Sequence, residues 1–419
     1  MTELLARSGF RRLLVGQAVS SLGDWMATVA LMALVLNLSG SATAVGGVLV
    51  LRLLSSMVAG PIAARVTVGL GRRRVMLGAD AARVAVSAAL PLVGALWWVY
   101  PLAFMLELLS LLFLPARDAS VPVLVGVPPD AGQRPDEQAV ESRLGLANAA
   151  VQASSYAAIP LGAAGFGLVY WVIGTLGLTG AFGGRAPYLI VFWLNAATFV
   201  FSYLAIRGIA LADTDERLDA GSTGSYLAGL RVPLVRTLLP GLVCVAVGLG
   251  ALFSVGVLYV QQVLHSSPVQ FGLMIAGFGV GGCLGLLLRG TPAGWPPLRR
   301  VRTGAVLQGL TITMMSSTGS TTMALLGSIL FGATATVTLL ASTGVLQQWL
   351  RPGERDLAFA AVHATVRAVL ALAALAAGVA ADLAPAVDWW ISLEPAQVVL
   401  GSAGLVVLAG GLLVRDTPR

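Results

Sequence analysis

The chain has 419 residues, of which 57% are hydrophobic and 11% are charged. A soluble domain carries roughly 25% charged residues, so a water-soluble protein of this length could not cover its surface with so few. All 26 basic residues are arginine, and the lack of lysine excludes a Walker A phosphate loop, a pyridoxal Schiff base and a Ser-x-x-Lys nucleophile. The composition therefore indicates a polytopic membrane protein.

Apolar stretches recur along the whole chain, and each is long enough to cross a hydrocarbon core as a helix. A short basic leader with Arg7, Arg11 and Arg12 precedes the first stretch, which is longer than a signal-peptide core and has no convincing cleavage site. We therefore expect the first span to stay attached. The sequence predicts twelve spans, at residues 12–38, 43–64, 75–98, 101–124, 142–170, 187–207, 236–262, 269–289, 302–319, 321–348, 356–382 and 391–414.

The arginines are unevenly divided between the two sets of loops that twelve spans create. The termini and the loops after even-numbered spans contain 22 of the 26 arginines, whereas the opposite loops contain only Arg185. Cytoplasmic loops are enriched in arginine, so this bias predicts a multi-pass protein of the cell membrane with both termini in the cytoplasm. It also accounts for the net charge of +7 without a nucleic acid partner, because the arginines form short clusters between apolar runs.

The longest polar interval, residues 209–235, divides the spans into two groups of six. Residues 41–46 (Ser-Ala-Thr-Ala-Val-Gly), between spans 1 and 2, are weakly similar to residues 267–272 (Ser-Pro-Val-Gln-Phe-Gly), between spans 7 and 8, which supports a duplication. We predict an N-terminal six-helix bundle over 1–208, a cytoplasmic linker over 209–235 and a C-terminal six-helix bundle over 236–419. Two repeats of this kind are typical of one major class of transporters.

Five short motifs, spread over nearly the full length, match a known family pattern. They are Phe10-Arg-Arg-Leu-Leu-Val-Gly-Gln17, Ser21-Leu-Gly-Asp-Trp25, Gly40-Ser-Ala-Thr-Ala-Val-Gly46, Leu114-Pro-Ala-Arg117 and Gln270-Phe-Gly-Leu273. In these motifs the chain resembles the major facilitator superfamily, in the branch of macrolide-efflux and enterobactin-exporter-like proteins. The resemblance implies an all-α polytopic fold of twelve transmembrane helices in two pseudo-symmetric six-helix bundles. It also implies a monomer in which spans 1, 4, 7 and 10 surround a central cavity.

Two segments depart from the superfamily's pattern. Its loop between spans 2 and 3 usually reads Gly-x-x-x-Asp-Arg-x-Gly-Arg-Arg, but here Val68 and Gly69 stand where the Asp-Arg pair is expected. The carboxylate that the resemblance assigns to a latch of the outward-facing state is therefore missing. Span 5 matches the superfamily's antiporter signature only in part, in the segment Ile159-Pro-Leu-Gly-Ala-Ala-Gly165. The candidate gating loop keeps Gly60, Arg72, Arg73 and Arg74.

Ionisable side chains inside the spans are costly, so each of them marks a function or a buried pair. Counting the helical rise from the cytoplasmic ends places Asp24, Arg52, Glu107 and Arg367 near the midplane of the membrane. Asp24, on span 1, is predicted to bind a proton or a cationic substrate; a fixed Asp24–Arg52 ion pair that orients spans 1 and 2 is an equally supported alternative. Glu107, on span 4, is the second candidate for proton coupling.

Other polar residues of the spans have both a functional and a packing interpretation. His363 lies four residues before Arg367 on span 11, so a proton relay is conceivable, although an interhelical hydrogen bond is favoured. Asp80 and Arg83 are three residues apart on span 3 and are expected to pair locally. The amides that could line a polar cavity, or bond helix to helix, are Gln17, Gln261 and Gln308.

These features predict a secondary active transporter and not an enzyme. We expect a proton-coupled exporter that moves an amphipathic drug-like or natural-product molecule, of the siderophore or macrolide type, by alternating access. The alternatives are a lipid or lysolipid transporter of the same fold, and a membrane receptor or assembly subunit that has lost transport. The expected partners are the small-molecule substrate, the proton and the lipid bilayer; no metal spacing is present in the sequence, and we expect no cofactor.

Overall fold

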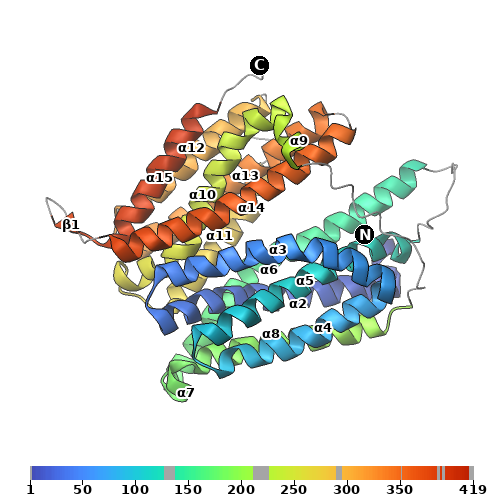
Figure 1. Ribbon diagram of the computed structural model, residues 1–419, viewed down its shortest axis with the longest axis horizontal. Helices are drawn as coiled ribbons and strands as arrows, with labels where there is room; N and C mark the ends of the chain where they lie inside the picture. The colour runs from blue at the N-terminus through green and yellow to red at the C-terminus, as the bar shows by residue number, and fades with distance from the viewer. Residues whose placement is uncertain are drawn as a thin grey trace. The chain divides into compact units, whose positions relative to one another are not determined.

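The computed structural model describes residues 2–126, 137–210, 226–288, 295–350, 352–384, 387–388 and 392–414. Within these ranges, twelve helices have at least 18 residues, and they follow the predicted spans in order (Figure 1). The predicted all-α fold is therefore confirmed. The long helices are α2 (Ser8–Ser39), α3 (Ala42–Leu70), α4 (Arg72–Ala89), α5 (Leu96–Leu124), α6 (Glu137–Thr175), α8 (Ala186–Arg207), α10 (Pro233–Gln262), α11 (Pro268–Leu288), α12 (Pro297–Ser316), α13 (Thr321–Trp349), α14 (Pro352–Leu383) and α15 (Pro395–Leu413).

The third and fourth spans differ from their predicted bounds. The sequence predicts that span 3 runs to residue 98, but α4 ends at Ala89, and the 3₁₀ turn η1 (Leu90–Leu92) follows it. Pro91 lies in that turn and has no backbone N–H to continue a helical hydrogen-bond ladder. The chain is extended at Val93, and α5 begins at Leu96. The remaining short elements are α1 (Thr2–Ala6), α7 (Ala181–Gly184), α9 (Tyr226–Arg231) and an antiparallel pair of strands, β1 (Val387–Asp388) and β2 (Ser392–Leu393).

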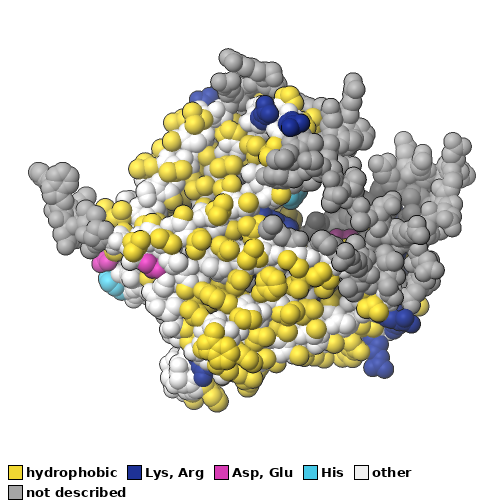
Figure 2. All heavy atoms as spheres, viewed as in Figure 1, with side chains coloured by type: hydrophobic (Ala, Val, Ile, Leu, Met, Phe, Trp, Pro, Cys, Tyr) yellow, Lys and Arg dark blue, Asp and Glu magenta, His cyan; other side chains and the backbone are white. Residues whose placement is uncertain are grey.

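The surface of the helices is suited to lipid. Ten of the described helices are long and apolar enough to cross a membrane. Helix α12 falls short because its first turns carry Arg299, Arg300 and Arg302, and α3 is apolar over Ala42–Ser56. Figure 2 shows hydrophobic side chains spread widely over the described part of one face, and large ones such as Leu287 are well exposed. A contiguous surface of this kind would be costly in water, so the chain is a multi-pass membrane protein.

Small residues let neighbouring helices approach closely. A Cβ atom added at Gly281 of α11 would collide with the backbone of Ile329 in α13, and one added at Gly332 of α13 would collide with the backbone of Phe278 in α11. Because each glycine faces the backbone of the other helix, α11 and α13 can pack at a distance that larger residues would prevent.

The contacts divide the chain into two compact units. The first consists of Met1–Ala30 and Leu54–Ala220, and the second of Leu31–Leu53 and Gly221–Arg419. The predicted bundles differ from these units in the segment Leu31–Leu53, and the proposed division at residues 209–235 stays a prediction. Buried residues at the centre of the first unit include Phe10, Met76, Phe113, Val151 and Ile206. Those of the second unit include Leu238, Val301, Leu346, Val362 and Val414.

Candidate functional site

A buried ion pair lies in the first unit, between Asp80 and Arg83 of α4. The Arg83 guanidinium carbon lies 4.6 Å from the ring centre of Phe113, in α5, and 4.5 Å from that of Phe199, in α8. The aromatic faces attract the cation and offset part of the cost of taking it out of water. The expected local pair is confirmed, and it joins α4 to both neighbouring helices.

The residues that the sequence suggests for proton or substrate coupling lie in different units. Asp24, on α2, and Glu107, on α5, are half-buried in the first unit, whereas Arg52, on α3, is half-buried in the second. The Asp24–Arg52 pair and the coupling roles of the two carboxylates therefore stay predictions. Gln17 is buried, and its amide donates a 2.8 Å hydrogen bond to the hydroxyl of Ser21 on the same helix.

The polar candidates of the second unit differ in their exposure and in their hydrogen-bond partners. His363 and Arg367 are both exposed on α14, and the Nδ1 atom of His363 lies 2.8 Å from a backbone carbonyl of its own helix. Gln308 is fully buried, and its amide donates a 3.3 Å hydrogen bond to Thr338, which joins α12 to α13. Gln261 is exposed near the end of α10.

Arginines of the candidate gating loop hold α4 against the ends of two helices. Arg72 is buried and donates to the carbonyl of Ala119, near the end of α5, at 2.9 Å. Arg73 donates to the carbonyl of Arg207, the last residue of α8, at 2.7 Å. Cations are favourable at the C-terminal ends of helices, where carbonyl groups have no partner within the helix. Arg74 is exposed, and the side-chain surroundings of Gly60 lie outside the described residues.

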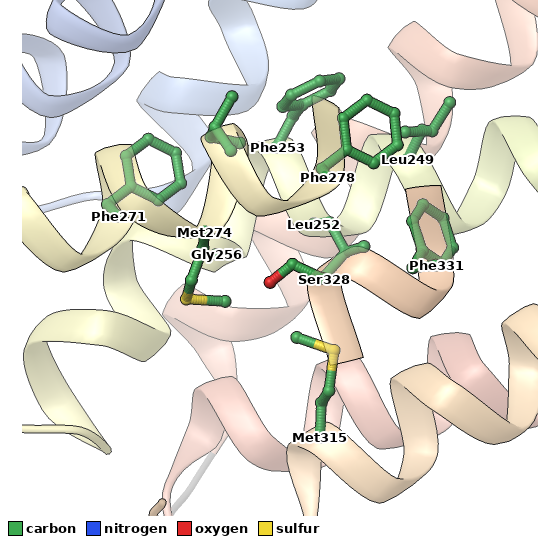
Figure 3. A pocket seen from close by; sticks show the side chains of 11 residues that line it. Leu249, Leu252, Phe253, Gly256, Phe271, Met274, Phe278, Met315, Ser328 and Phe331 are labelled. Carbon is green, nitrogen blue, oxygen red and sulfur yellow. The ribbon is translucent and has the colours of Figure 1, made fainter. Parts of the chain in front are cut away.

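A small apolar pocket lies among α10, α11, α12 and α13 in the second unit (Figure 3). Among the eleven described residues that line it, Ser328 alone carries a hydroxyl or charged group. That hydroxyl donates to the carbonyl of Ala324 at 2.6 Å, and it lies between Met274 and Met315 in Figure 3. The aromatic lining residues are Phe253, Phe271, Phe278 and Phe331.

Sequence reasoning missed this pocket, although part of its pattern is visible in the sequence. Phe271, Met274 and Phe278 recur at the spacing of one helical face, on α11. Such a stripe is typical of an ordinary hydrophobic core as well, so the spacing alone does not distinguish a pocket from a core.

The carboxylate of Asp382, near the end of α14, caps the start of α3 within the second unit. It accepts hydrogen bonds from the backbone N–H groups of Ala42 and Thr43, at 2.9 and 3.0 Å, and from the hydroxyl of Ser41. A negative charge at a helix N-terminus satisfies N–H groups that have no partner within the helix. The hydroxyl of Ser254, in α10, donates to the carbonyl of Ala42 at 3.0 Å.

Two glycines allow α3 and α14 to pack closely beside this cap. A Cβ atom added at Gly46 would meet the backbone of Ala374, and one added at Gly378 would meet the backbone of Ala42. The start of α3 is therefore held to α14 by a charged cap and by direct backbone packing. In the sequence, Asp382 stands out only as the last residue of the predicted span 356–382.

Solved structures of transporters resemble the chain over almost its whole length. A mutant of the nucleoside transporter NupG is 10% identical, with a TM-score of 0.69 and coverage of 98% of both chains. A POT family transporter in complex with a thioalcohol-conjugated peptide is 12% identical, with a TM-score of 0.67 and coverage of 97% of this chain and 95% of that one.

A bacterial homologue of the human lysosomal transporter Spinster, in an inward-facing and occupied conformation, is 14% identical, with a TM-score of 0.65 and coverage of 97% and 93%. No family model and no curated protein matches the chain. At these identities the likeness concerns the fold, and together with the twelve long helices it shows that the chain has the major facilitator fold.

Proposed function

We propose that the protein is a secondary transporter that moves an amphipathic small molecule by alternating access, and that the pocket among α10, α11, α12 and α13 receives the apolar part of this substrate. The observation that carries the proposal is the lining of the pocket, where aromatic and methionine side chains surround a single hydroxyl. The resemblance of the fold to that of known transporters supports the transport part of the proposal.

The chemistry of the pocket restricts the substrate class. A sugar, a nucleoside or an inorganic anion would lose hydrogen bonds to water on entering it, and Ser328 could replace few of them. Methionine side chains adapt to irregular apolar groups, and aromatic rings stack on flat ones. A molecule with an aromatic or polyketide-like apolar part and a polar end outside the pocket fits these constraints.

We propose export as the direction and the proton as the coupling ion. Two carboxylates in membrane helices of the first unit, Asp24 and Glu107, are half-buried and are the candidates for carrying the proton. A carboxylate in a membrane span is costly to keep unless it has a function or a structural partner.

Transport in proteoliposomes tests the substrate proposal. Uptake of ethidium, erythromycin, uridine and lysophosphatidylcholine is compared in wild type, Phe253→Ala and the matched control Leu326→Ala. Phe253 is half-buried and lines the pocket, whereas Leu326, on α13, is exposed outside it. We expect transport of the first two probes, and about a tenfold rise in KM in Phe253→Ala because a pocket contact is lost.

The outcomes separate the competing functions. Unchanged kinetics in Phe253→Ala would remove the pocket from the substrate path. Transport of uridine in preference to the amphipathic probes would contradict the substrate class. Movement of lysophosphatidylcholine alone would favour the lipid transporter, and no movement of any probe would favour a protein that has lost transport.

A further inference from the structure

The part of the chain from residue 220 to residue 353 contains seven arginines and no aspartate or glutamate. This stretch includes α9, α10, α11, α12 and α13. Of these arginines, the five that the structure describes lie at the end of α9 and in the first turns of α10 and α12, at positions 231, 236, 299, 300 and 302. One end of this part of the second unit is therefore strongly cationic, and it will attract anions from its surroundings.

A groove opens at this cationic end. Helices α11 and α12 each pack along α13, while the described residues give them little direct contact with one another. This open groove lies where α11 ends and α12 begins. Its walls and floor include Leu288 of α11, Arg300, Thr303 and Leu307 of α12, and Leu330 and Val337 of α13.

The groove has a polar end and an apolar end. At the polar end Arg300 lines the cavity, and the neighbouring Arg299 places its guanidinium carbon 4.5 Å from the ring centre of Trp295. Tryptophan and arginine together are typical of the membrane–water interface. About 10 Å further along α12, by the helical rise, Leu307 faces the apolar part of the cavity. Leu307 and Leu330 are 39% and 48% exposed, so this end is open to lipid.

We propose that this groove binds an anionic phospholipid, with the phosphate at Arg299 and Arg300 and one acyl chain along α13 between α11 and α12. An anionic headgroup matches the cationic end, and an acyl chain matches the exposed leucines below it. A soluble phosphate would use only the first of these features. The phospholipid site requires that these arginines lie at the cytoplasmic leaflet, where anionic lipids are abundant. This orientation is the only assumption that the lipid proposal has in common with the proposed function.

Lipid binding to the purified full chain in detergent tests the assignment. Phosphatidylglycerol and phosphatidylcholine with identical acyl chains are titrated, and retained lipid is measured by native mass spectrometry alongside the thermal unfolding temperature. We expect phosphatidylglycerol to bind and to raise the unfolding temperature more than phosphatidylcholine does. Arg299→Gln and Arg300→Gln should each weaken phosphatidylglycerol binding about fivefold, because each basic residue near an anionic lipid contributes roughly that factor.

Two further variants separate the site from general effects of charge and stability. Arg236→Gln removes an exposed arginine of α10 that does not line the groove, so it should weaken phosphatidylglycerol binding much less than Arg300→Gln does. Leu330→Trp keeps every arginine but fills the apolar end, and it should weaken binding of both lipids. Equal effects of the two lipids on wild type, or equal losses in Arg236→Gln and Arg300→Gln, would overturn the proposal.

The source of the phosphate is tested with sn-glycerol 3-phosphate, which lacks acyl chains. If this compound competes with phosphatidylglycerol at equal concentration, the groove is a site for soluble phosphate and the lipid assignment is wrong. None of these measurements requires transport, so failure of the lipid proposal is distinguishable from failure of the substrate proposal.

Discussion

At the scale of single residues, the Asp80–Arg83 pair has the most direct consequence for stability. Both side chains are buried, and Arg83 is also held between Phe113 and Phe199. Arg83→Met should destabilise the first unit by about 3–5 kcal/mol, because it leaves the Asp80 carboxylate buried without its cation. The free energy of unfolding in mild detergent, followed by tryptophan fluorescence, measures this loss.

The double variant Asp80→Asn/Arg83→Met is the control for the pair. It removes both charges, so it should be more stable than Arg83→Met alone. If the two variants were equally unstable, the loss would come from the packing of Arg83 against the rings and not from an uncompensated charge.

Substitutions of single carboxylates also test the proposal that transport is coupled to protons. Asp24→Asn keeps the size of the side chain but cannot exchange a proton, so transport driven by a pH gradient should be lost while substrate exchange across the membrane continues. Asp118→Asn is the matched control, because Asp118 is an exposed carboxylate that pairs with Arg117 at 2.7 Å. Unchanged proton dependence in Asp24→Asn would remove Asp24 from the mechanism, and Glu107→Gln would then be the next variant.

At the scale of the helix, the cap of α3 by Asp382 makes the start of that helix depend on α14. Asp382→Ala removes the acceptor of two backbone N–H groups, and a lost cap costs about 1 kcal/mol. We expect hydrogen exchange of the amides over residues 42–46 to become about fivefold faster, which corresponds to that free energy.

Glu394→Ala is the matched control for this helix. Glu394 caps α15 in the same unit through a capping box with Gln397, so its loss should accelerate exchange at the start of α15 only. Faster exchange at α3 in both variants would indicate a general loosening of the unit. No change in Asp382→Ala would show that the close packing at Gly46 and Gly378 holds α3 without the cap.

The helices were largely predictable because a span depends on local composition. The predicted span 187–207 corresponds to α8 (Ala186–Arg207), and 321–348 corresponds to α13 (Thr321–Trp349). The break at Pro91 was missed because the residues around it stay apolar, so hydrophobicity alone does not mark the end of α4.

The sites were less predictable because they depend on contacts between distant residues. The Asp80–Arg83 pair follows from a spacing of three on one helix, and the structure confirms it. The contact of Asp382 with Ser41 joins residues 341 positions apart, and the pocket combines four helices. No local pattern determines which side chains such packing brings together.

At the scale of the whole molecule, the distribution of arginine predicts the orientation in the membrane. With 22 of 26 arginines in the termini and the loops after even-numbered spans, both termini should lie in the cytoplasm. A green fluorescent protein fused to the C-terminus should therefore fluoresce. An alkaline phosphatase inserted after Gly180, between α6 and α8, should be active, because that loop should lie outside the cytoplasm.

Replacing Arg72, Arg73 and Arg74 with glutamine should lower both signals only slightly, because nineteen arginines would remain on the same side. The inverse pattern, a dark C-terminal fusion with an inactive phosphatase, would place the arginine-rich ends outside the cell. The direction of transport and the leaflet proposed for the anionic phospholipid would then both be reversed. A pattern in which both fusions report the same side would instead contradict the seven spans expected between them, because Gly180 follows the fifth span and the C-terminus follows the twelfth.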